Sequence, residues 1–576
     1  MSSFRALTPA EISAVEAAGV SAEAWPQIRV AKDFRPEQLR QCRLEGQVEL
    51  ASGARIFRSA VRNYRIGENS LVEGVTALEC RCRSTFGNGT PVAAMNECGG
   101  RTVKIFDRLS AQVAYLMAVY RHRPALIAAL ERMIDDYAAA GSSQIGEVGR
   151  DCRITGARFI REVRIGDGVT VDGASILENG TLCDGARIGV DVKAYDFIAA
   201  EEARIGNGAT VERCFVGESC ILEKGFSAAE SLFFANSHCE NGEAASIFAG
   251  PYTVSHHKSS LLIAGMFSFF NAGSGSNQSN HLFKSGAVHQ AVHLRGCKFA
   301  SSAYVMSPAL EGAFTMVMGH HSYHHDTSIF PYSYLIEKEG KSILMPGANL
   351  TSYGAVRDIE KWPARDRRRI RRDVIDFDEY NPYVTGAMLQ AVDMLHRLEE
   401  QDPDAALYAY NKVQIRAAGL RRGIGLYNKA IVAALGTMLG KGSDSTEHDG
   451  RGRWLDLAGQ YIAKREADAI VEAIERGELT TYREIDARFS DFHLHYDDYA
   501  RSWALAAYAA LLGRTPTRAE IDEAVEAGAN AHAAMRRTTD ADRDRDCSLD
   551  MAVGYGLDCD DERERRDDYY AVRGLK

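Results

Sequence analysis

Residues 165–188, IGDGVTVDGASILENGTLCDGARI, decide the fold of this chain. An aliphatic residue recurs about every six positions, and Gly or Asp-Gly stands beside most of these residues: Ile165, Val171, Leu177, Leu182 and Ile188. An α-helix would repeat its apolar positions about every 3.6 residues and would not tolerate a glycine in every turn. The six-residue period predicts a parallel β-solenoid, in which each hexad supplies one short strand, one inward side chain and one turn, and three hexads close a triangular coil.

The same period appears in two further blocks, upstream at Leu44, Leu50, Ile56, Val61 and Ile66, and downstream at Ile205, Val211, Val216 and Ile221. Steps of five residues, such as Leu177 to Leu182, indicate shortened turns. Residues 232–356 hold short apolar runs bounded by Gly, Ser, Asn and Pro, which predict more strands with longer turns. The predicted fold class is therefore a mainly β solenoid, with a helical hairpin inserted into it and a C-terminal α-helical domain.

Changes in the sequence pattern divide the chain. Apolar residues at helical spacing replace the hexads after residue 105, and the composition shifts to Leu, Ala, Glu and Arg after Trp362. Thr8 and Thr517, each followed three residues later by glutamate, are expected helix N-caps, and Gly528 is the expected end of the second helix. The predicted segments are an N-terminal helix and lead-in (1–41), a first β-helix block (42–105), a helical insertion (106–144), the main β-helix with site loops (145–361), the C-terminal helical domain (362–536) and a charged tail (537–576).

Composition and charge indicate an ordinary soluble protein. The 576 residues carry a formal net charge of −10, and this acidity predicts no nucleic-acid partner. The basic run at 365–372 (RDRRRIRR) is expected on a solvated face, with anion binding as the alternative. The chain has no secretory leader pattern and no apolar window of about 18 residues, so we expect a cytoplasmic protein without membrane contact. Six cysteines in the solenoid segments are expected to be buried thiols: Cys152, Cys183, Cys214, Cys220, Cys239 and Cys297.

Histidines are concentrated in one part of the chain. Ten of the sixteen lie between residues 238 and 325: His238, His256, His257, His281, His289, His293, His320, His321, His324 and His325. A solenoid interior is only one side chain wide, so we expect most of them on turns and outer faces. Coils in register would then stack them into one polar patch, where we place the functional site.

The first motif of this region is residues 250–259, GPYTVSHHKS. Successive side chains of an extended strand point to opposite faces, so His256 and His257 would diverge. One could serve catalysis while the other supports a turn, and a structural role for both is an equal alternative. Lys258 beside them is a candidate for binding a substrate.

The second motif, residues 271–281 (NAGSGSNQSNH), suits an anion. Glycines allow backbone N–H groups to converge on phosphate or carboxylate oxygens, and neighbouring amides and a lysine add donors and charge. The candidate residues of this motif and the positions after it are Asn277, Gln278, Asn280, His281, Lys284, His289 and Gln290. The alternative is a long connection without a ligand.

The third motif is residues 319–326, GHHSYHHD. His320 and His325, together with His281 or His289, could supply three imidazoles to a zinc ion that keeps one position open for water. Paired histidines also occur in ordinary loops, and no partner that would orient these rings can be assigned from the sequence.

The hexads resemble the left-handed parallel β-helix superfamily, whose members include acyltransferases and γ-type carbonic anhydrases. The resemblance implies the left hand of the coils and a homo-oligomer, a trimer or a dimer. Three stretches, 86–100, 250–281 and 346–368, look like an uncharacterised bacterial family of long hexapeptide-repeat proteins with no established reaction, and the likeness covers residues 44–372. In that family the third motif usually reads Gly-Arg-His-Tyr, so His320, His324 and His325 are departures that weaken the zinc hypothesis.

These motifs and the resemblance favour a transferase that moves an acyl group to an amine or hydroxyl of a phosphorylated or nucleotide-linked small molecule. His281 or His257 would take the proton of the acceptor, and Asn277 or a backbone N–H would face the developing oxyanion. Lys284 or Arg357 would hold a phosphate. The candidate catalytic histidines are His281, His257, His256, His289 and His321. Acyl-CoA is one donor that fits. The alternatives are a zinc-dependent lyase or hydrolase of γ-carbonic-anhydrase type and a non-catalytic β-helix scaffold.

Overall fold

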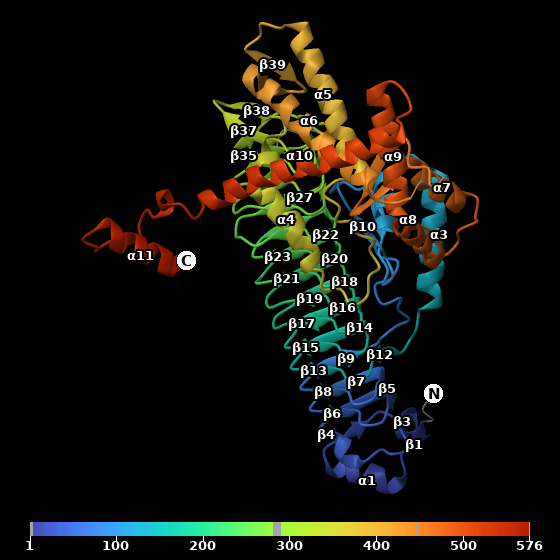
Figure 1. Cartoon of the computed structure of the whole chain (residues 1–576). Helices are drawn as coiled ribbons and strands as arrows, with labels where there is room; N and C mark the ends of the chain where they lie inside the picture. Colours follow the sequence, from blue (N-terminus) through green and yellow to red (C-terminus); the bar gives the residue numbers. More distant parts are fainter. Residues whose placement is uncertain (1–3, 280–289, 444–446, 575–576) are drawn as a thin grey trace.

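The computed structural model describes residues 4–279, 290–443 and 447–574. A tall stack of parallel coils rises from the N-terminal end, and helices gather around its upper part (Figure 1). This confirms the predicted fold class, a β-solenoid with a helical insertion and a helical C-terminal region. The stack begins before the predicted first block, because β2 and β3 already pair in parallel with β5.

Most strands belong to two long parallel ladders. The first contains β2 (Ser21–Ala22), β3 (Ile28–Val30), β5 (Arg43–Leu50), β7 (Ala60–Ile66), β9 (Ala77–Glu79), β12 (Gly146–Val148), β14 (Phe159–Ile165), β16 (Ile176–Leu182), β18 (Lys193–Ala199), β20 (Thr210–Val216), β22 (Ser227–Phe233), β24 (Glu243–Ala245), β25 (Phe248–Ala249), β27 (Leu261–Ile263), β28 (Gly265–Phe267), β30 (Asn277–Ser279), β31 (Ala291–His293), β33 (Tyr304–Met306), β34 (Ala309–Glu311) and β36 (His320–His321); β1 (Arg5–Ala6) joins it antiparallel to β3.

The second ladder contains β4 (Leu39–Arg40), β6 (Arg55–Phe57), β8 (Leu71–Glu73), β13 (Arg153–Thr155), β15 (Thr170–Asp172), β17 (Arg187–Ile188), β19 (Arg204–Ile205), β21 (Ile221–Glu223), β23 (His238–Glu240), β26 (Val254–Ser255), β29 (Asn271–Ala272), β32 (Lys298–Phe299), β35 (Met316–Met318) and β37 (Tyr334–Lys338). Two hairpins close the upper end: β38 (Lys341–Met345) returns antiparallel to β37, and β39 (Leu407–Tyr410) pairs with β40 (Val413–Arg416).

The register stacks inward side chains into columns. Ile165 lies beside Leu182, seventeen residues later, which is three hexads less one shortened turn. One buried column, the long column, passes without a break through Val30, Leu50, Ile66, Val148, Ile165, Leu182, Ala199, Val216, Phe233, Ala249, Phe267, His293 and Glu311. It is apolar until its last two members.

The chain leaves the coils earlier than predicted. After β9 it forms an antiparallel hairpin, β10 (Pro91–Ala93) with β11 (Thr102–Lys104), so the first β-helix block does not reach residue 105. The hairpin is fixed against later coils, because the N–H of Ala93 donates to Glu230 (2.8 Å) and that of Met95 to the carbonyl of Ser246 (2.8 Å). The helices α2 (Ala111–Val119) and α3 (Pro124–Ala140) follow, and β12 then resumes the stack by pairing with β7.

The remaining helices are α1 (Pro9–Ala17), α4 (Tyr353–Ala364), α5 (Pro382–Gln401), α6 (Ala417–Leu439), α7 (Lys464–Glu475), α8 (Tyr482–Leu494), α9 (Tyr496–Leu512), α10 (Arg518–Arg545) and α11 (Glu562–Arg573), with short 3₁₀ turns at Trp25–Gln27, Pro36–Gln38, Ala348–Thr351 and Leu549–Met551 and a hairpin of β41 (Trp454–Leu457) and β42 (Gln460–Ala463). Thr8 and Thr517 cap α1 and α10 as predicted. The expected limits at 361/362 and 536/537 fall inside α4 and α10.

Gly528 does not end α10. A Cβ atom at Gly528 would lie 2.6 Å from the Cα of Gly436 in α6, so this glycine lets two helices cross at close range. Helix α10 therefore continues to Arg545 and, with α11, forms an arm that projects from the body (Figure 1).

The basic run at 365–372 holds the C-terminal region onto the coils. Arg372 forms ion pairs with Glu201 (2.9 Å) and Glu218 (3.4 Å), and all three side chains are at least nine-tenths buried. The carboxylate of the next residue, Asp373, accepts N–H groups from Ala111 of α2 (2.8 Å) and from Ala235 in the coils (3.1 Å). The expected solvated face is therefore wrong for Arg372, although other arginines of the run are exposed.

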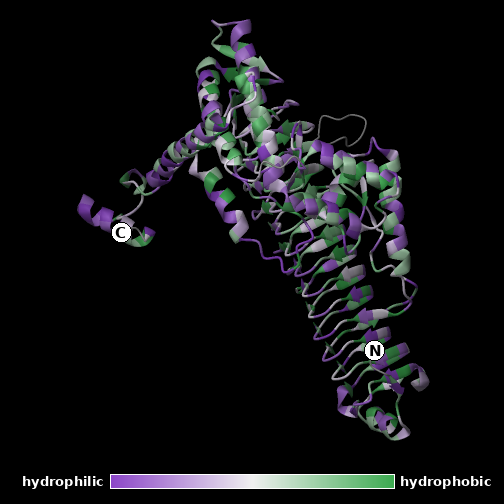
Figure 2. Cartoon of the chain, turned by 45° about the vertical axis from the view of Figure 1, so that its right-hand side comes forward, coloured by the Kyte–Doolittle hydropathy of each residue, from purple (hydrophilic) through white to green (hydrophobic). Residues whose placement is uncertain are grey.

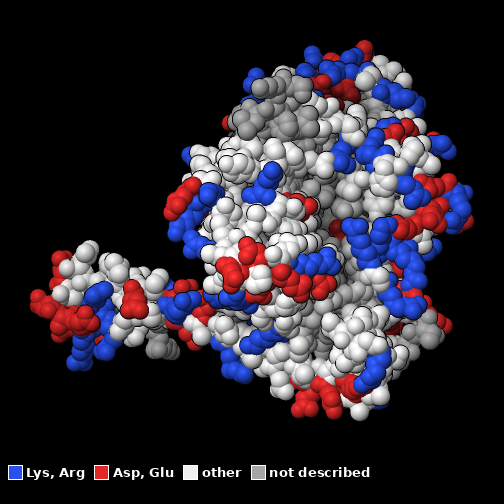
Figure 3. Space-filling model, turned by 90° about the horizontal axis from the view of Figure 1, so that it is seen from above, with Lys and Arg blue, Asp and Glu red and all other residues white. Residues whose placement is uncertain are grey.

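The surface follows the composition. Figure 2 shows apolar residues on the strands of the stack and hydrophilic residues along the arm, and Figure 3 shows both signs of charge on the arm and over much of the body. The six predicted solenoid cysteines are buried free thiols. No helix in the described part of the chain is long and apolar enough to cross a membrane.

Candidate functional site

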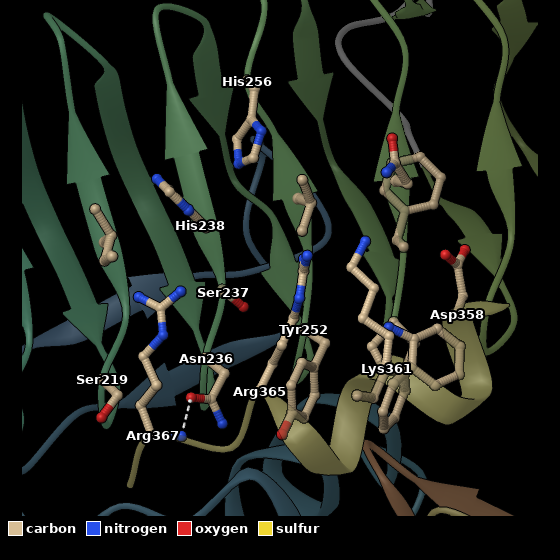
Figure 4. Close-up of a pocket in the computed structure, with 16 residues that line it drawn as sticks. Ser219, Asn236, Ser237, His238, Tyr252, His256, Asp358, Lys361, Arg365 and Arg367 are labelled. Carbon is tan, nitrogen blue, oxygen red and sulfur yellow. Dashed lines mark hydrogen bonds between the residues drawn. The ribbon is translucent and has the colours of Figure 1, made fainter. Parts of the chain in front are cut away.

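A pocket of about 210 Å³ lies between the outer face of the second ladder and helix α4 (Figure 4). Strands β21, β23, β26 and β29 form one wall, and α4 with the segment after it forms the other. Its polar and aromatic lining comprises Ser219, Asn236, Ser237, His238, Tyr252, His256, Phe269, Phe270, Asn271, Asp358, Lys361, Trp362, Arg365 and Arg367.

Three basic side chains of this pocket have no acidic partner. Within the described residues no carboxylate lies within 4.0 Å of Lys361, Arg365 or Arg367, whereas Asp358 on the same wall is already paired with Lys298. Burial and the neighbouring Arg365 lower the pKa of Lys361. Figure 4 shows the three side chains extending from α4 and its C-terminal segment toward the imidazoles on the strands. Cations that converge without compensation make the pocket suited to an anion.

Two histidines and a glutamate stand on the opposite wall. Nε2 of His238 lies 2.9 Å from Oε1 of Glu240, and the ring of His238 lies 4.4 Å from the ring of His256. The register places His238 beside Val254, one coil later, so His256 follows just beyond the strand end. The three residues lie in a row, Glu240 to His238 to His256, which is called the relay below, and its two imidazoles line the pocket.

The protonation states of the relay follow from its surroundings. Burial lowers the pKa of His256, and His238 adds to this effect; burial also lowers the pKa of His238. Burial alone would raise the pKa of Glu240, but Lys224, 2.6 Å away, and His238 lower it below its ordinary value. Near pH 7 the relay is therefore an ionised carboxylate with neutral imidazoles, the state in which a histidine can accept a proton.

Tyr252 supplies an unsatisfied polar group. Its ring stacks on Phe269 at 5.3 Å, and the side chain is 4% exposed. Its hydroxyl is buried and makes no hydrogen bond of normal geometry within the described residues; the amide of Asn236 is the polar group near it. Asn236 itself accepts the backbone N–H of Arg367 (3.1 Å), which fixes the start of the basic segment.

A chain of contacting polar side chains lies inside the upper coils. The amide Nε2 of Gln278 is 2.7 Å from Nε2 of His293, Nδ1 of His293 contacts Glu311, and the other oxygen of Glu311 is 2.8 Å from Nε2 of His325. His293 and Glu311 are the last two members of the long column. Most histidines of the cluster were expected on turns and outer faces, and His293, His321 and His325 depart from this expectation, because each is at least 98% buried. The other described members, His238, His256, His257, His320 and His324, are partly or fully exposed.

The central carboxylate of this buried chain, Glu311, is ionised. Burial would raise the pKa of Glu311, but the two imidazoles lower it, and Glu311 in turn raises the pKa of His325 against the effect of burial. The nearby His321 is different: burial lowers its pKa to about 4, with His325 acting in the same direction. Its Nδ1 lies 2.8 Å from the Ser342 hydroxyl. We interpret the chain as structural, because it fills the core.

The predicted site residues are distributed over several places. His256, His257 and Lys258 are all exposed on the turn after β26, and of these three only His256 lines the pocket; Arg357 lies beside Asp358 outside the pocket. Gln278 and His321 belong to the core. The side-chain oxygen of Asn277 is buried without a hydrogen-bond partner among the described residues, and Gln290 accepts a hydrogen bond from the Arg101 guanidinium (2.7 Å). Four candidates lie outside the described residues: Asn280, His281, Lys284 and His289.

Among the described residues, His257 and His321 therefore do not line one common site. The predicted zinc ligands are not brought together either. His320 is exposed against Tyr304, whereas His325 is buried on Glu311. His281 lies outside the described residues.

Some pocket residues could have been found in the sequence. His238 belongs to the histidine-rich region, and the seventeen-residue coil places it near His256. Lys361 and Arg365 could not be placed, because a helix outside the repeat brings them to the sheet.

The fold and the pocket define a β-solenoid protein with an external cationic cleft that contains an imidazole relay. Residues 54–399 match the family described as "Domain of unknown function (DUF4954)", and the chain belongs to this family. Residues 438–575 match "Domain of unknown function (DUF6819)". An "Uncharacterized protein" of Treponema pallidum (strain Nichols) is 23% identical over 621 residues, which cover 89% of this chain and 83% of that protein.

Among solved structures, the "Crystal structure of putative acetyltransferase from Desulfovibrio desulfuricans G20" matches 58% of this chain and 76% of its own, with 10% identity and a TM-score of 0.11. A score this low carries no argument about function.

Proposed function

We propose that the pocket beside α4 binds the phosphorylated end of a small molecule and that His256 acts as general base in acyl transfer to its amine or hydroxyl. One observation carries the proposal: three cations without acidic partners and a neutral imidazole relay face the same pocket. An anionic group on Lys361, Arg365 and Arg367 would bring a neighbouring nucleophile toward the rings of the opposite wall.

In this reaction the imidazole of His256 accepts the proton of the acceptor N–H or O–H while the acceptor attacks the acyl carbon. The acyl carbon–sulfur bond of an acyl-CoA thioester then breaks, a carbon–nitrogen or carbon–oxygen bond forms, and the proton passes to the departing thiolate. The Glu240 carboxylate, which acts to raise the pKa of His256, would stabilise the imidazolium that forms there. A volume of about 210 Å³ suits the acceptor, whereas most of a coenzyme would lie outside the pocket.

Binding is tested by titration calorimetry with inorganic pyrophosphate and with uridine diphosphate. We expect saturable binding to the parent, with an affinity about tenfold or more lower in Lys361→Gln. Arg365→Gln should lower the affinity by a similar factor, because each substitution removes a charged donor. Arg369→Gln is the matched control, an exposed arginine of the same basic run that does not line the pocket. Equal affinities in Lys361→Gln and the control would refute the assignment of this pocket.

Chemistry is tested separately by the release of free thiol from acetyl-CoA in the presence of phosphorylated amines and alcohols. Turnover should occur in the parent protein, be lost in His256→Gln, and remain in His257→Gln, whose imidazole lies on the exposed turn. A His256→Gln variant that releases thiol at the parent rate would exclude this residue as the base. No thiol release by the parent with any acceptor would instead favour the scaffold.

A further inference from the structure

A second group of metal-type ligands lies in the C-terminal region, on elements that the proposed reaction does not use. His448 is in the connection between α6 and β41, His495 is in the turn between α8 and α9, and Asp498 is in the first turn of α9. One ligand atom from each of these residues lies within 4.8 Å of those of the others.

The backbone around this group is fixed in two places. The N–H of Ser443 donates to Oδ1 of Asp498 (2.6 Å), and the Ser443 hydroxyl reaches the same oxygen (2.9 Å). On the other side of His448, Gly450 lies directly on α9, where a Cβ atom would come within 1.8 Å of the carbonyl of Tyr499. The loop that carries His448 is therefore held against the helix that carries Asp498.

The side chains of the group have unused coordination capacity. The rings of His448 and His495 stack at 4.3 Å with 28° between their planes, and their nitrogens make no hydrogen bond within the described residues. The third member, Asp498, accepts both hydrogen bonds from Ser443 on a single carboxylate oxygen. Its Oδ1 is fixed by Ser443, which leaves Oδ2 available.

We propose that His448, His495 and Asp498 bind a zinc ion through two imidazole nitrogens and one carboxylate oxygen, with a remaining position for water. This donor set suits a first-row divalent cation, and small rotations of the side chains would bring the three atoms to bonding distance. The other three-residue group, His238, Glu240 and His256, is less suited: Glu240 is already paired with Lys224, and unpaired cations face the same pocket. The ion would fasten the loop between α6 and β41 to α9.

The test uses the full-length chain after treatment with a chelator, titrated with zinc chloride. We expect one zinc per chain and a melting temperature that rises with zinc concentration, because the ion binds the folded state. Asp498→Asn keeps the acceptor for Ser443 but removes the charge, and His448→Gln removes a ring; each should weaken binding about a hundredfold or more. His396→Gln, on the exposed face of α5, is the matched control and should bind like the parent.

Further measurements separate the outcomes. Cobalt(II) bound in place of zinc should give visible absorption bands in the parent that are lost in His448→Gln. Parent-like zinc affinity in both ligand variants, or zinc binding that is lost in His238→Gln only, would overturn the proposal, as would the absence of zinc binding in the parent. Pyrophosphate binding to the pocket beside α4 should be unchanged in His448→Gln, so this inference and the proposed function can fail independently.

Discussion

The lower and upper coils share one backbone geometry but fill their interiors with different kinds of side chain. In the lower coils the long column is aliphatic, as at Ile66, Ile165 and Leu182, whereas in the upper coils the same inward position holds His293 and Glu311. All five side chains are buried. The comparison shows that strand register, and not the apolar character of each residue, defines the interior of this solenoid.

The two interiors depend on different forces. Aliphatic members of the column contribute roughly in proportion to the apolar area that they bury, each independently of its neighbours. His293, Glu311 and His325 are useful only together, because each satisfies a hydrogen-bonding group of the next. A fully connected polar network tolerates burial, but a partly connected one is strongly destabilising.

The largest effect should come from breaking this network at its centre. Glu311→Ala leaves two buried imidazoles without their carboxylate and should lower the free energy of unfolding by about 3–5 kcal/mol. Leu182→Ala, at the same column position in the lower coils, leaves a cavity and should cost about 2–5 kcal/mol. Urea unfolding followed by far-ultraviolet circular dichroism measures both.

The decisive control replaces the three ionisable members of the network and leaves Gln278, whose side-chain oxygen still accepts the N–H of Ile263 (3.0 Å). A triple variant, His293→Phe, Glu311→Leu and His325→Leu, removes the charges together and should recover most of the stability that Glu311→Ala loses, because no buried charge remains unpaired. No comparable recovery is available for Leu182→Ala. If the triple variant is as unstable as the single one, the upper coils depend on packing and not on the ionic chain.

Much of the fold could be predicted because hexads report local geometry. Every coil repeats the same strand and turn, so Ile165 and Val171 alone indicate the architecture, and the return of the stack at residues 145–146 was visible as a resumed period. The limits of the helices were harder to predict. Gly528 is a typical helix stop in sequence, yet its role depends on Gly436, a partner far away in the chain.

The site was only partly predictable for the same reason. His256 could be selected by composition, since it lies on a strand end among other polar residues. His293 and Glu311 are one coil apart, a relation that the sequence contains but that the irregular spacing of the upper coils obscures. The position of Lys361 depends on how α4 packs across the sheet, and no local pattern encodes that contact.

An intermediate effect is expected from pH, at the buried imidazole of His321. The pKa of His321 falls from 6.5 to about 4 on folding, so protonation favours the unfolded state. Stability from this residue is complete above about pH 6.5 and is lost as the pH falls toward 4, by up to about 3 kcal/mol. The difference in unfolding free energy between the parent and His321→Gln should shrink by this amount over that range.

The measurement is a series of urea titrations between pH 7 and pH 4. The lower coils provide the reference, because Leu177→Ala removes no titrating group and should stay a constant distance below the parent. A pH-independent difference between the parent and His321→Gln would mean that folding does not lower the pKa of His321, contrary to the effect expected from its burial.

The smallest effect tests the transition between the two interiors. In the second ladder, successive inward positions are Leu222, Cys239, Ser255 and Ala272, so a hydroxyl first enters this column at Ser255. The Ser255 hydroxyl is buried and has no hydrogen-bond partner among the described residues. An unsatisfied buried hydroxyl costs about 1–3 kcal/mol, so Ser255→Ala should raise the free energy of unfolding by about 1 kcal/mol.

The matched change one coil below should have the opposite sign. Cys239→Ala removes a sulfur that fills the same column and should lower stability by about 1 kcal/mol. The two urea midpoints, compared with the parent, decide the matter: a loss in both variants would show that the Ser255 hydroxyl contributes to the core. Opposite signs at these neighbouring positions would instead show that the column changes from apolar to polar side chains at Ser255. This residue lies directly before His256 in the chain, so the change occurs beside the pocket.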